Sequence, residues 1–256
     1  MRGLWAAEGC TPPGPRCGDY LLCCLGAKAP WRLVGLLTAR QGGKLRPMAP
    51  VLTIAGLKGG VGKTSAAAAL ACHWSTTRRV LLVDADPNGS ALRWHGRSDA
   101  GPGFECVPLA RAPQAMAKPW ELVIMDTAGG SRDEQRTYAE GSDFVLAPCQ
   151  VAAGAIEQVA ELGALLRDAG ARFGVLLTMV DERRRQDADK ARAVLEGFGL
   201  PVLQTQISSL SCWPKAEAAG VAVRDARLDS GRPDSGAARA WAQVEALALE
   251  IEGGMA

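Results

Sequence analysis

Beyond residue 50 the chain alternates short apolar runs with longer Ala-rich stretches. Continuous runs of β-branched and aliphatic residues are typical of strands buried on both faces of a sheet. The Ala-rich stretches contain no internal proline and favour helices. We expect strands at Val51 to Leu57, Arg79 to Ala85, Leu122 to Thr127 and Phe144 to Pro148, with weaker candidates at Phe173 to Val180 and Pro201 to Gln204, and helices at Thr64 to Trp74, Ala153 to Ala169, Asp187 to Phe198 and Ala237 to Ile251.

This alternation predicts one α/β domain at residues 50–252, with a doubly wound, mostly parallel sheet and helices on both faces. A chain of 256 residues with 48% hydrophobic residues can bury a core of that size. In such sheets, ligands bind beyond the carboxyl ends of the strands, where the strand order reverses. The residues that follow the expected strands are therefore the candidates for chemistry.

Residues 1–49 show neither helical nor strand periodicity and contain several prolines, so we expect a disordered extension. They carry seven Lys and Arg residues but only two Asp and Glu residues. The net charge of +2 hides this imbalance and does not by itself indicate nucleic-acid binding. Because Met48 lies just before the first expected strand, a native start at Met48 is a further hypothesis, which the N-terminal peptide of natively expressed protein would test.

The eight cysteines lack the paired C-x2-C spacing of a zinc site and are too scattered to indicate a disulfide framework. Cys72, Cys106, Cys149 and Cys212 have apolar or small neighbours, where a free thiol behaves as a small buried hydrophobic side chain. No stretch of the sequence reaches the roughly 20 apolar residues that a membrane-spanning helix needs. These features favour a reduced, cytoplasmic protein.

The segment from Leu57 to Thr64 reads L-K-G-G-V-G-K-T and lies between an expected strand and an expected helix, as a phosphate-binding loop requires. Glycines in such a loop let backbone N–H groups converge on phosphate oxygens, and the helix N-terminus adds partial positive charge. Lys63 would contact the β- and γ-phosphates, and the Thr64 hydroxyl would bind Mg²⁺. The predicted nucleotide-binding residues are Lys58, Gly59, Gly60, Val61, Gly62, Lys63, Thr64 and Ser65.

Leu57 stands where the common P-loop pattern has its first glycine, and the chain has the form K-G-G-x-G-K-[ST] instead. In this form it resembles the ParA/MinD family of P-loop ATPases, and within it the short ParA-like partition ATPases, over roughly residues 50 to 250. The resemblance implies a SIMIBI-type P-loop fold with ATP and Mg²⁺ as cofactors. It also implies that Lys58 reaches across an ATP-sandwiched homodimer to the partner's phosphates, and that Lys58, Lys63 and Asp86 are catalytic.

Two expected strands end in carboxylates: V-L-L-V is followed by Asp84 and Asp86, and L-V-I-M by Asp126. Charge at the end of a buried strand is costly unless a cation or water chemistry uses it. The first segment resembles the family's D-x-D-P-Q motif, which implies that Asp84 supports the Mg²⁺ shell and Asp86 positions or activates the attacking water. The second resembles a Walker B segment, in which Asp126 holds Mg²⁺ through a bonded water. The predicted metal-site residues are Thr64, Asp84 and Asp126.

The chain departs from the family pattern in two places. Asn88 replaces the usual glutamine, and Ala128 replaces the proline that often follows the D-T pair of the γ-phosphate-sensing loop. Taken alone, each acidic segment could be a turn that ends a strand and caps a helix. The end of the strand at Thr178 to Asp181 is where the family usually recognises adenine, but the match is too loose to assign a contact, so the base pocket stays open.

The resemblance implies a molecular switch with weak intrinsic ATPase activity. ATP would close a dimer that binds DNA non-specifically, and a ParB-like or other adaptor would stimulate hydrolysis and release it, so that a plasmid, chromosome or other large cargo is partitioned or positioned. The strongest basic cluster runs from Arg183 to Arg185 and continues to Lys190 and Arg192. It could be a solvated helix start or could contact DNA phosphates.

Two other functions stay open. The first is a membrane-surface regulator of division-site or complex placement, similar to MinD, whose C-terminal amphipathic helix would enter lipid. Glu245, Glu250 and Glu252 in the last helix suit an anionic membrane poorly. The second is an iron–sulfur enzyme similar to the nitrogenase iron protein, for which Cys149 alone is insufficient. Liposome flotation, an iron assay and ATP-dependent DNA retardation would separate these functions.

Overall fold

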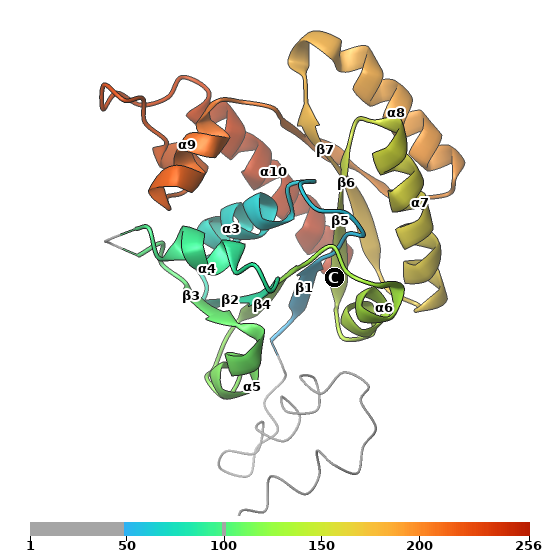
Figure 1. The fold of residues 1–256 in the computed structure, drawn as a ribbon, viewed down its shortest axis with the longest axis horizontal. Helices are drawn as coiled ribbons and strands as arrows, with labels where there is room; N and C mark the ends of the chain where they lie inside the picture. The colour runs from blue at the N-terminus through green and yellow to red at the C-terminus, as the bar shows by residue number, and fades with distance from the viewer. Residues whose placement is uncertain (1–48, 99–100) are drawn as a thin grey trace, which may run out of the picture.

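A computed structural model describes residues 49–98 and 101–256. Its centre is a seven-stranded, all-parallel sheet with the strand order β3-β2-β4-β1-β5-β6-β7 (Figure 1). The predicted fold class is therefore confirmed. The predicted N-terminal extension and the alternative start at Met48 lie outside the described residues, apart from Ala49. The strands are β1 (Val51–Ile54), β2 (Val80–Ala85), β3 (Glu105–Pro108), β4 (Leu122–Thr127), β5 (Phe144–Gln150), β6 (Phe173–Val180) and β7 (Val202–Ser208).

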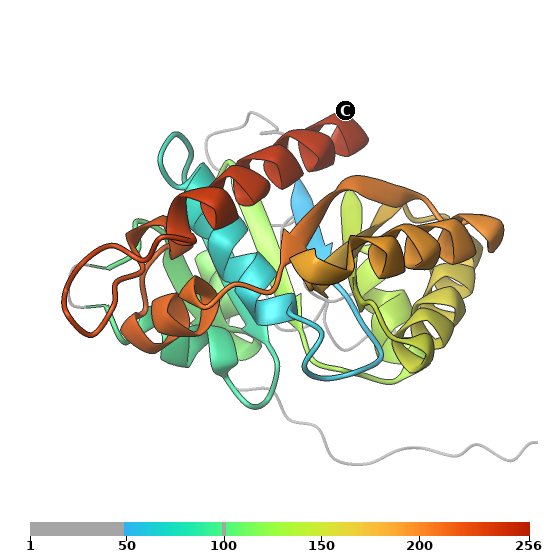
Figure 2. The same ribbon diagram turned by 90° about the horizontal axis from the view of Figure 1, so that it is seen from above.

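Helices cover both faces of the sheet. One face packs against α3, α4, α9 and α10, and the other against α5, α6, α7 and α8. Figure 2 shows α10 running along the same side as α3, with α7 and α8 together at the other end of the molecule. The helices are α3 (Lys63–Trp74), α4 (Ser90–His95), α5 (Ala112–Ala115), α6 (Arg132–Glu140), α7 (Ala153–Asp168), α8 (Arg185–Gly197), α9 (Cys212–Ala219) and α10 (Ala237–Met255), with single 3-10 turns η1 (Leu109–Arg111), η2 (Glu182–Arg184) and η3 (Val223–Asp225).

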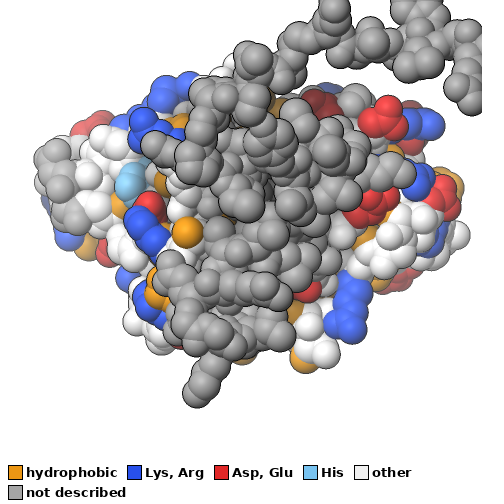
Figure 3. Space-filling view, turned by 90° about the horizontal axis from the view of Figure 1, so that it is seen from below, with side chains coloured by type: hydrophobic (Ala, Val, Ile, Leu, Met, Phe, Trp, Pro, Cys, Tyr) orange, Lys and Arg blue, Asp and Glu red, His pale blue; other side chains and the backbone are white. Residues whose placement is uncertain are grey.

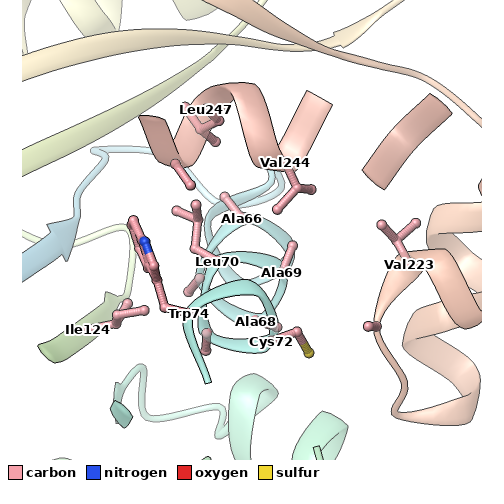
Figure 4. Packing of buried hydrophobic residues seen from close by; sticks show 14 of the residues in the cluster. Ala66, Ala68, Ala69, Leu70, Cys72, Trp74, Ile124, Val223, Val244 and Leu247 are labelled. Atoms are coloured by element: carbon pink, nitrogen blue, oxygen red, sulfur yellow. The ribbon is translucent and has the colours of Figure 1, made fainter. Parts of the chain in front are cut away.

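The helix α3 is apolar on nearly all sides because it is enclosed by the sheet and by other helices. Every residue from Ala66 to Cys72 is buried. Figure 4 shows α3 between Ile124 of β4 and the pair Val244 and Leu247 of α10. Small side chains let the neighbouring backbones approach α3 closely. Because α3 is enclosed, its sequence is a run of alanines and lacks the amphipathic stripe of a surface helix.

Polar contacts also join α10 to the C-terminal end of α3 and to β7. The indole N–H of Trp74 donates to a carboxylate oxygen of Glu252 at 2.8 Å, and Arg78 donates to the same oxygen at 2.6 Å. At the β7 edge of the sheet, Glu250 accepts hydrogen bonds from the backbone N–H groups of Gln204 and Thr205 at 2.7 and 2.8 Å. These acidic residues thus hold α10 in place.

Several elements were not predicted from the sequence. The strand β3 lies at the sheet edge, and its only buried residue is Val107, so it lacks a clear apolar run. The helices α4, α5, α6 and α9 were also missed, and three of these four have eight residues or fewer. For α6 a signal was present, because Ser131 and Glu134 form a capping box at its start. The strand β1 ends at Ile54, three residues before the predicted end, because the chain turns there into the glycine-rich loop.

Two surface properties bear on function. In the part of the chain that the structure describes, no helix combines the length and apolar character needed to cross a bilayer. On the face seen in Figure 3, Lys and Arg side chains alternate with Asp and Glu side chains around the uncovered rim. That rim therefore shows no single-sign patch of the kind that attracts nucleic acid.

Candidate functional site

The glycine-rich loop leaves β1 and enters α3 beyond the carboxyl ends of the central strands. In Figure 2 this loop, in blue, lies between the α3 side and the α7–α8 side of the molecule. Gly60 and Gly62 adopt φ values of 78° and 90°, in the left-handed region that a side chain disfavours. The strand β1 is flanked by β4 and β5, so the loop sits at the point where the strand order reverses.

The N-terminus of α3 has the features of an anion-binding site. Its N-cap residue is Gly62, no side chain caps the first turn, and that turn contains no acidic residue. The first N–H groups of a helix have no intrahelical partner and carry partial positive charge. Thr64 and Ser65 lie in this first turn. The arrangement therefore fits a phosphate group.

Lys63 is 6% exposed and turns back across the loop. Its ammonium nitrogen donates to the carbonyl oxygen of Lys58 at 2.8 Å. Burial lowers the pKa of Lys63, and the nearby carboxylates of Asp126 and Asp86 oppose that shift. The lysine is thus a buried cation near two acidic strand ends.

Asp84 and Asp126 are neighbours in the sheet, paired across β2 and β4. One carboxylate oxygen of Asp84 accepts from the Asp86 backbone N–H at 3.1 Å, and the other accepts from the Leu92 N–H at 2.9 Å. Asp84 therefore also caps the first turn of α4, a structural role that the sequence alternative of a capping aspartate anticipated. Its Mg²⁺ role stays a prediction.

Asp126 accepts no hydrogen bond from a backbone N–H group of the described chain. It is fully buried, and among the described residues neither carboxylate oxygen has a well-aligned hydrogen-bond donor, although the Thr64 hydroxyl is close enough to lower its pKa. Burial raises the pKa of Asp126 from 3.8 to about 7, and the charges of Asp84 and Asp86 add to the rise, while Thr64 and Lys63 oppose it. A buried carboxylate with free lone pairs is an expected place for a cation.

The residues around Asp126 fit a Mg²⁺ ion that arrives with a nucleotide. Among the described residues, no group of three or more His, Cys, Asp or Glu side chains could hold a metal by itself. Mg²⁺ is commonly bound by one or two carboxylates together with substrate phosphates, so a dedicated cage is not required. Asp126, Asp84 and the Thr64 hydroxyl supply donors of the right chemistry.

The raised pKa of Asp126 predicts how the stability of the folded chain depends on pH. The carboxyl holds its proton more tightly in the folded chain, so it favours the folded state at low pH, and this contribution is lost as the pH rises from about 4 to about 7. The Asp126→Asn variant without nucleotide should therefore unfold at a higher temperature than wild type at pH 8, with a smaller difference at pH 5. Thermal unfolding at both pH values checks this, and equal differences at the two values would contradict it.

Asp86 lies just beyond β2 and is half-buried. Its carboxylate accepts from the Asn88 backbone N–H at 2.8 Å, which forms a local turn at the start of α4. Its charge is also felt at Lys63 and at Asp126, so it faces the same space as the loop. The predicted catalytic and metal-site carboxylates are thus brought together at the mouth of the glycine loop.

The loop after β4 touches the glycine loop directly. A Cβ atom placed on Gly129 would lie 3.0 Å from the Lys58 carbonyl carbon and 3.1 Å from the Gly59 nitrogen, so only glycine fits without displacement. Behind it, Gln135 donates to the Ala128 carbonyl at 3.4 Å. The D-T-A-G segment therefore contacts the backbone of Lys58, whose side chain is exposed.

Sequence reasoning missed two residues that contact the glycine loop. Gln150 donates to the Gly60 carbonyl at 2.8 Å, and the Thr178 hydroxyl donates to the Val61 carbonyl at 2.9 Å. Gln150 ends β5 and Thr178 lies in β6. The sequence indicates no role for Gln150 and marks Thr178 to Asp181 only as the place where the family usually recognises adenine, without a contact, although both residues stand near the carboxyl end of a strand.

An apolar cavity of about 180 Å³ adjoins the start of α3. It lies between Gly62 and Ser65 on one side and Thr178 and Met179 of β6 on another. The sequence left the base pocket open, and this cavity is one hollow that the structure places beside the loop. Its other walls are formed by Ala66, Ala69, Leu70, Ile207, Ser208, Ser209, Leu210, Trp213, Pro214, Val244 and Leu247.

The cysteines and most basic residues are not part of this site. Cys72, Cys149 and Cys212 are buried free thiols and Cys106 is partly buried, which agrees with the predicted structural role of these four.

Several basic residues have structural partners. Arg192 donates to two carbonyls of β7, Lys215 pairs with Asp234, and Arg239 pairs with Glu182.

Comparisons with known proteins agree on the family. A family model described as the CobQ/CobB/MinD/ParA nucleotide binding domain matches residues 52–223. The "Maintenance of carboxysome distribution protein A" of Gloeobacter kilaueensis is 29% identical over 188 residues, which cover 71% of this chain and 87% of the relative. The "Chromosome-partitioning ATPase Soj" of Thermus thermophilus is 30% identical over 205 residues, which cover 64% of this chain and 82% of the relative.

Solved structures share the fold at lower identity. An ATP complex of McdA from Cyanothece aligns with a TM-score of 0.63 at 17% identity, covering 81% of this chain and 98% of that one. At this identity the likeness supports the architecture alone. The glycine loop, the acidic strand ends and the sheet order thus occur together in a fold that is known with nucleotide bound.

Proposed function

Because the chain belongs to the CobQ/CobB/MinD/ParA nucleotide-binding family, we propose that it is an ATP-dependent, dimerising switch ATPase that partitions or positions a large cargo. Its reaction is ATP + H₂O to ADP + phosphate, with weak intrinsic activity. The family model describes nucleotide binding, and the names of the two relatives describe the distribution of carboxysomes and the partitioning of chromosomes. The cargo, a plasmid, chromosome or other large assembly, belongs to the proposal.

The observation that carries the proposal is the buried Asp126 carboxylate, which has only the Thr64 hydroxyl near it as a polar partner within the described chain, close to Lys63 and to the helix N-terminus at Gly62. A triphosphate with its cation would supply acceptors for the first-turn N–H groups, charged oxygens for the lysine and a cation for the carboxylate. Calorimetric titration of the protein with Mg-ATP tests it. Absence of binding would refute the proposal.

In the proposed site each residue has one task. The loop N–H groups from Gly59 to Ser65 bind phosphate oxygens, and Lys63 leaves the Lys58 carbonyl to contact the β- and γ-phosphates. Asp86 orients the attacking water and accepts its proton. Mg²⁺, when bound by Thr64, Asp84 and Asp126, would neutralise charge on the phosphates. The apolar cavity beside Ser65 would receive the base.

The exposed Lys58 side chain provides a test of dimerisation. In Lys58→Ala the backbone carbonyl that holds Lys63 is retained, so the affinity of the monomer for nucleotide should stay within about threefold of wild type. Loss of a charged contact to the partner's phosphate should weaken dimerisation by about tenfold or more. Sedimentation with a non-hydrolysable ATP analogue measures this, and dimers that persist at wild-type concentrations would disprove the role.

DNA is the proposed partner of the ATP-bound dimer. Arg183 and Arg184 are exposed in η2, and Arg185 is exposed at the start of α8; Asp181 caps η2 by accepting from the Arg183 N–H. Phosphate contacts of this kind are non-specific and weaken as salt rises. An ATP-dependent mobility shift of arbitrary duplex DNA, lost at high salt, is the expected result. A ParB-like or other adaptor would then stimulate hydrolysis and release the DNA.

The membrane alternative has less support. The helix α10 is buried along one face against α3, and Glu250 and Glu252 fix it to the sheet edge and to Arg78. Inserting this helix into lipid would require breaking those contacts. Flotation with anionic liposomes in the presence of ATP should leave the protein unbound, and its recovery with the liposomes would instead favour the membrane function.

A further inference from the structure

Two consecutive carbonyl groups of the glycine loop are held by side chains from neighbouring strands. The Gln150 side-chain nitrogen lies 2.8 Å from the Gly60 oxygen, and the Thr178 hydroxyl lies 2.9 Å from the Val61 oxygen. Gln150 and Thr178 are themselves partners in the register between β5 and β6. The sheet therefore places two donors side by side, matched to two successive acceptors of the loop.

A hydrogen bond to a carbonyl also orients the next N–H group. The peptide unit is planar and trans, so the C=O of one residue and the N–H of the next point in opposite directions. Fixing the Gly60 carbonyl toward Gln150 turns the Val61 N–H away from β5. Fixing the Val61 carbonyl toward Thr178 turns the Gly62 N–H away from β6. These are loop amides that a phosphate-binding loop directs at its ligand.

The two donors are held in place on their own side. Thr178 is 3% exposed. It packs against the loop, because a Cβ atom placed on Gly62 would lie 3.8 Å from the Thr178 Cβ. The Gln150 nitrogen also lies 3.0 Å from the sulfur of Met179. Met179 has a φ of 53°, an uncommon conformation for a residue other than glycine. The strand end is thus shaped to bring both side chains onto the loop.

We propose that Gln150 and Thr178 are positioning residues that pre-orient the Val61 and Gly62 amides toward the nucleotide's phosphates. This inference rests on the proposed nucleotide binding and adds the residues that organise the loop for it. Pre-organised N–H groups need no reorientation when the anion arrives, so the benefit appears as phosphate affinity. In this role both residues act through the loop backbone, and Thr178 also lines the apolar cavity beside the loop.

The test compares Thr178→Val and Thr178→Ser, because valine keeps the shape and loses the donor while serine keeps the donor. Calorimetry with Mg-ADP should show a loss of affinity of about three- to tenfold for Thr178→Val, as expected for one net hydrogen bond, and less than about twofold for Thr178→Ser. Gln150→Leu should lose affinity to a similar degree.

A matched control separates positioning from general stability. Thr53 is a fully buried β1 residue whose hydroxyl pairs with Ser142 at 2.6 Å, so Thr53→Val removes the same chemical group from an adjacent region of the sheet. It should bind Mg-ADP with wild-type affinity. Wild-type affinity in Thr178→Val, or an equal loss in Thr53→Val, would overturn the inference. Failure of wild type to bind Mg-ADP would remove both the proposed function and this inference.

Discussion

The Lys63→Ala variant should lose measurable ATP binding. Lys63 is the buried cation of the loop, and its ammonium is placed 2.8 Å from a backbone oxygen and near the charges of Asp126 and Asp86. Charged hydrogen bonds contribute about 1.5–3 kcal/mol each. Loss of contacts to two phosphates should thus reduce the affinity by about 100-fold or more. Calorimetric titration with Mg-ATP measures this.

The control for this variant is Lys118→Ala. Lys118 is an exposed lysine that pairs with Glu105 at the far edge of the sheet, so its removal deletes the same charge away from the loop. It should bind Mg-ATP like wild type. A Lys63→Ala protein that is folded by circular dichroism and binds Mg-ATP with unchanged affinity would show that the lysine does not contact phosphate.

The Asp86→Ala variant should bind ATP and fail to hydrolyse it. Asp86 is half-buried beside the loop and does not contact the loop backbone, so removing it leaves the phosphate cradle intact. A positioned general base contributes about 10²–10⁴-fold to a rate. We expect phosphate release in a single turnover to fall by about 100-fold, and the ATP-bound dimer to accumulate in sedimentation.

Asp86→Asn distinguishes chemistry from local structure. Asparagine keeps an oxygen that can accept from the Asn88 N–H, so it preserves the turn that leads into α4, but it carries no charge and cannot accept a proton. Both variants should therefore be equally inactive. Normal hydrolysis by Asp86→Asn would mean that the residue only shapes the turn, and unchanged turnover in Asp86→Ala would exclude any role.

The main strands and long helices were predictable because their residues are buried in a regular way. The strands β2, β4 and β5 are apolar on both faces, so their runs are continuous, and α3 has alanines on every side. The short elements were not predictable. The strand β3 is paired on one edge only, and α9 contains Pro214 within its first turn and has eight residues. Their formation depends on tertiary contacts more than on local pattern.

Within the site, the sequence located the residues that a motif encodes. The loop and the three aspartates come together because each lies at or just beyond the carboxyl end of a parallel strand, and these ends share one edge of the sheet. Gln150 and Thr178 could not be found in this way, because their role depends on a register match between β5 and β6. For Asp84 the sequence offered helix capping only as an alternative to a Mg²⁺ role, and the structure shows that it does cap α4.

The lysine–carbonyl contact in the glycine loop has a consequence for ligand choice. Since the Lys63 ammonium is already bonded to the Lys58 oxygen, an arriving ligand exchanges one acceptor for another rather than filling an empty place. A neutral oxygen gains little by this exchange, whereas a phosphate oxygen adds the attraction between opposite charges to the hydrogen bond. The Lys58 carbonyl thus competes with each ligand for the lysine, which favours anionic ligands over neutral solutes.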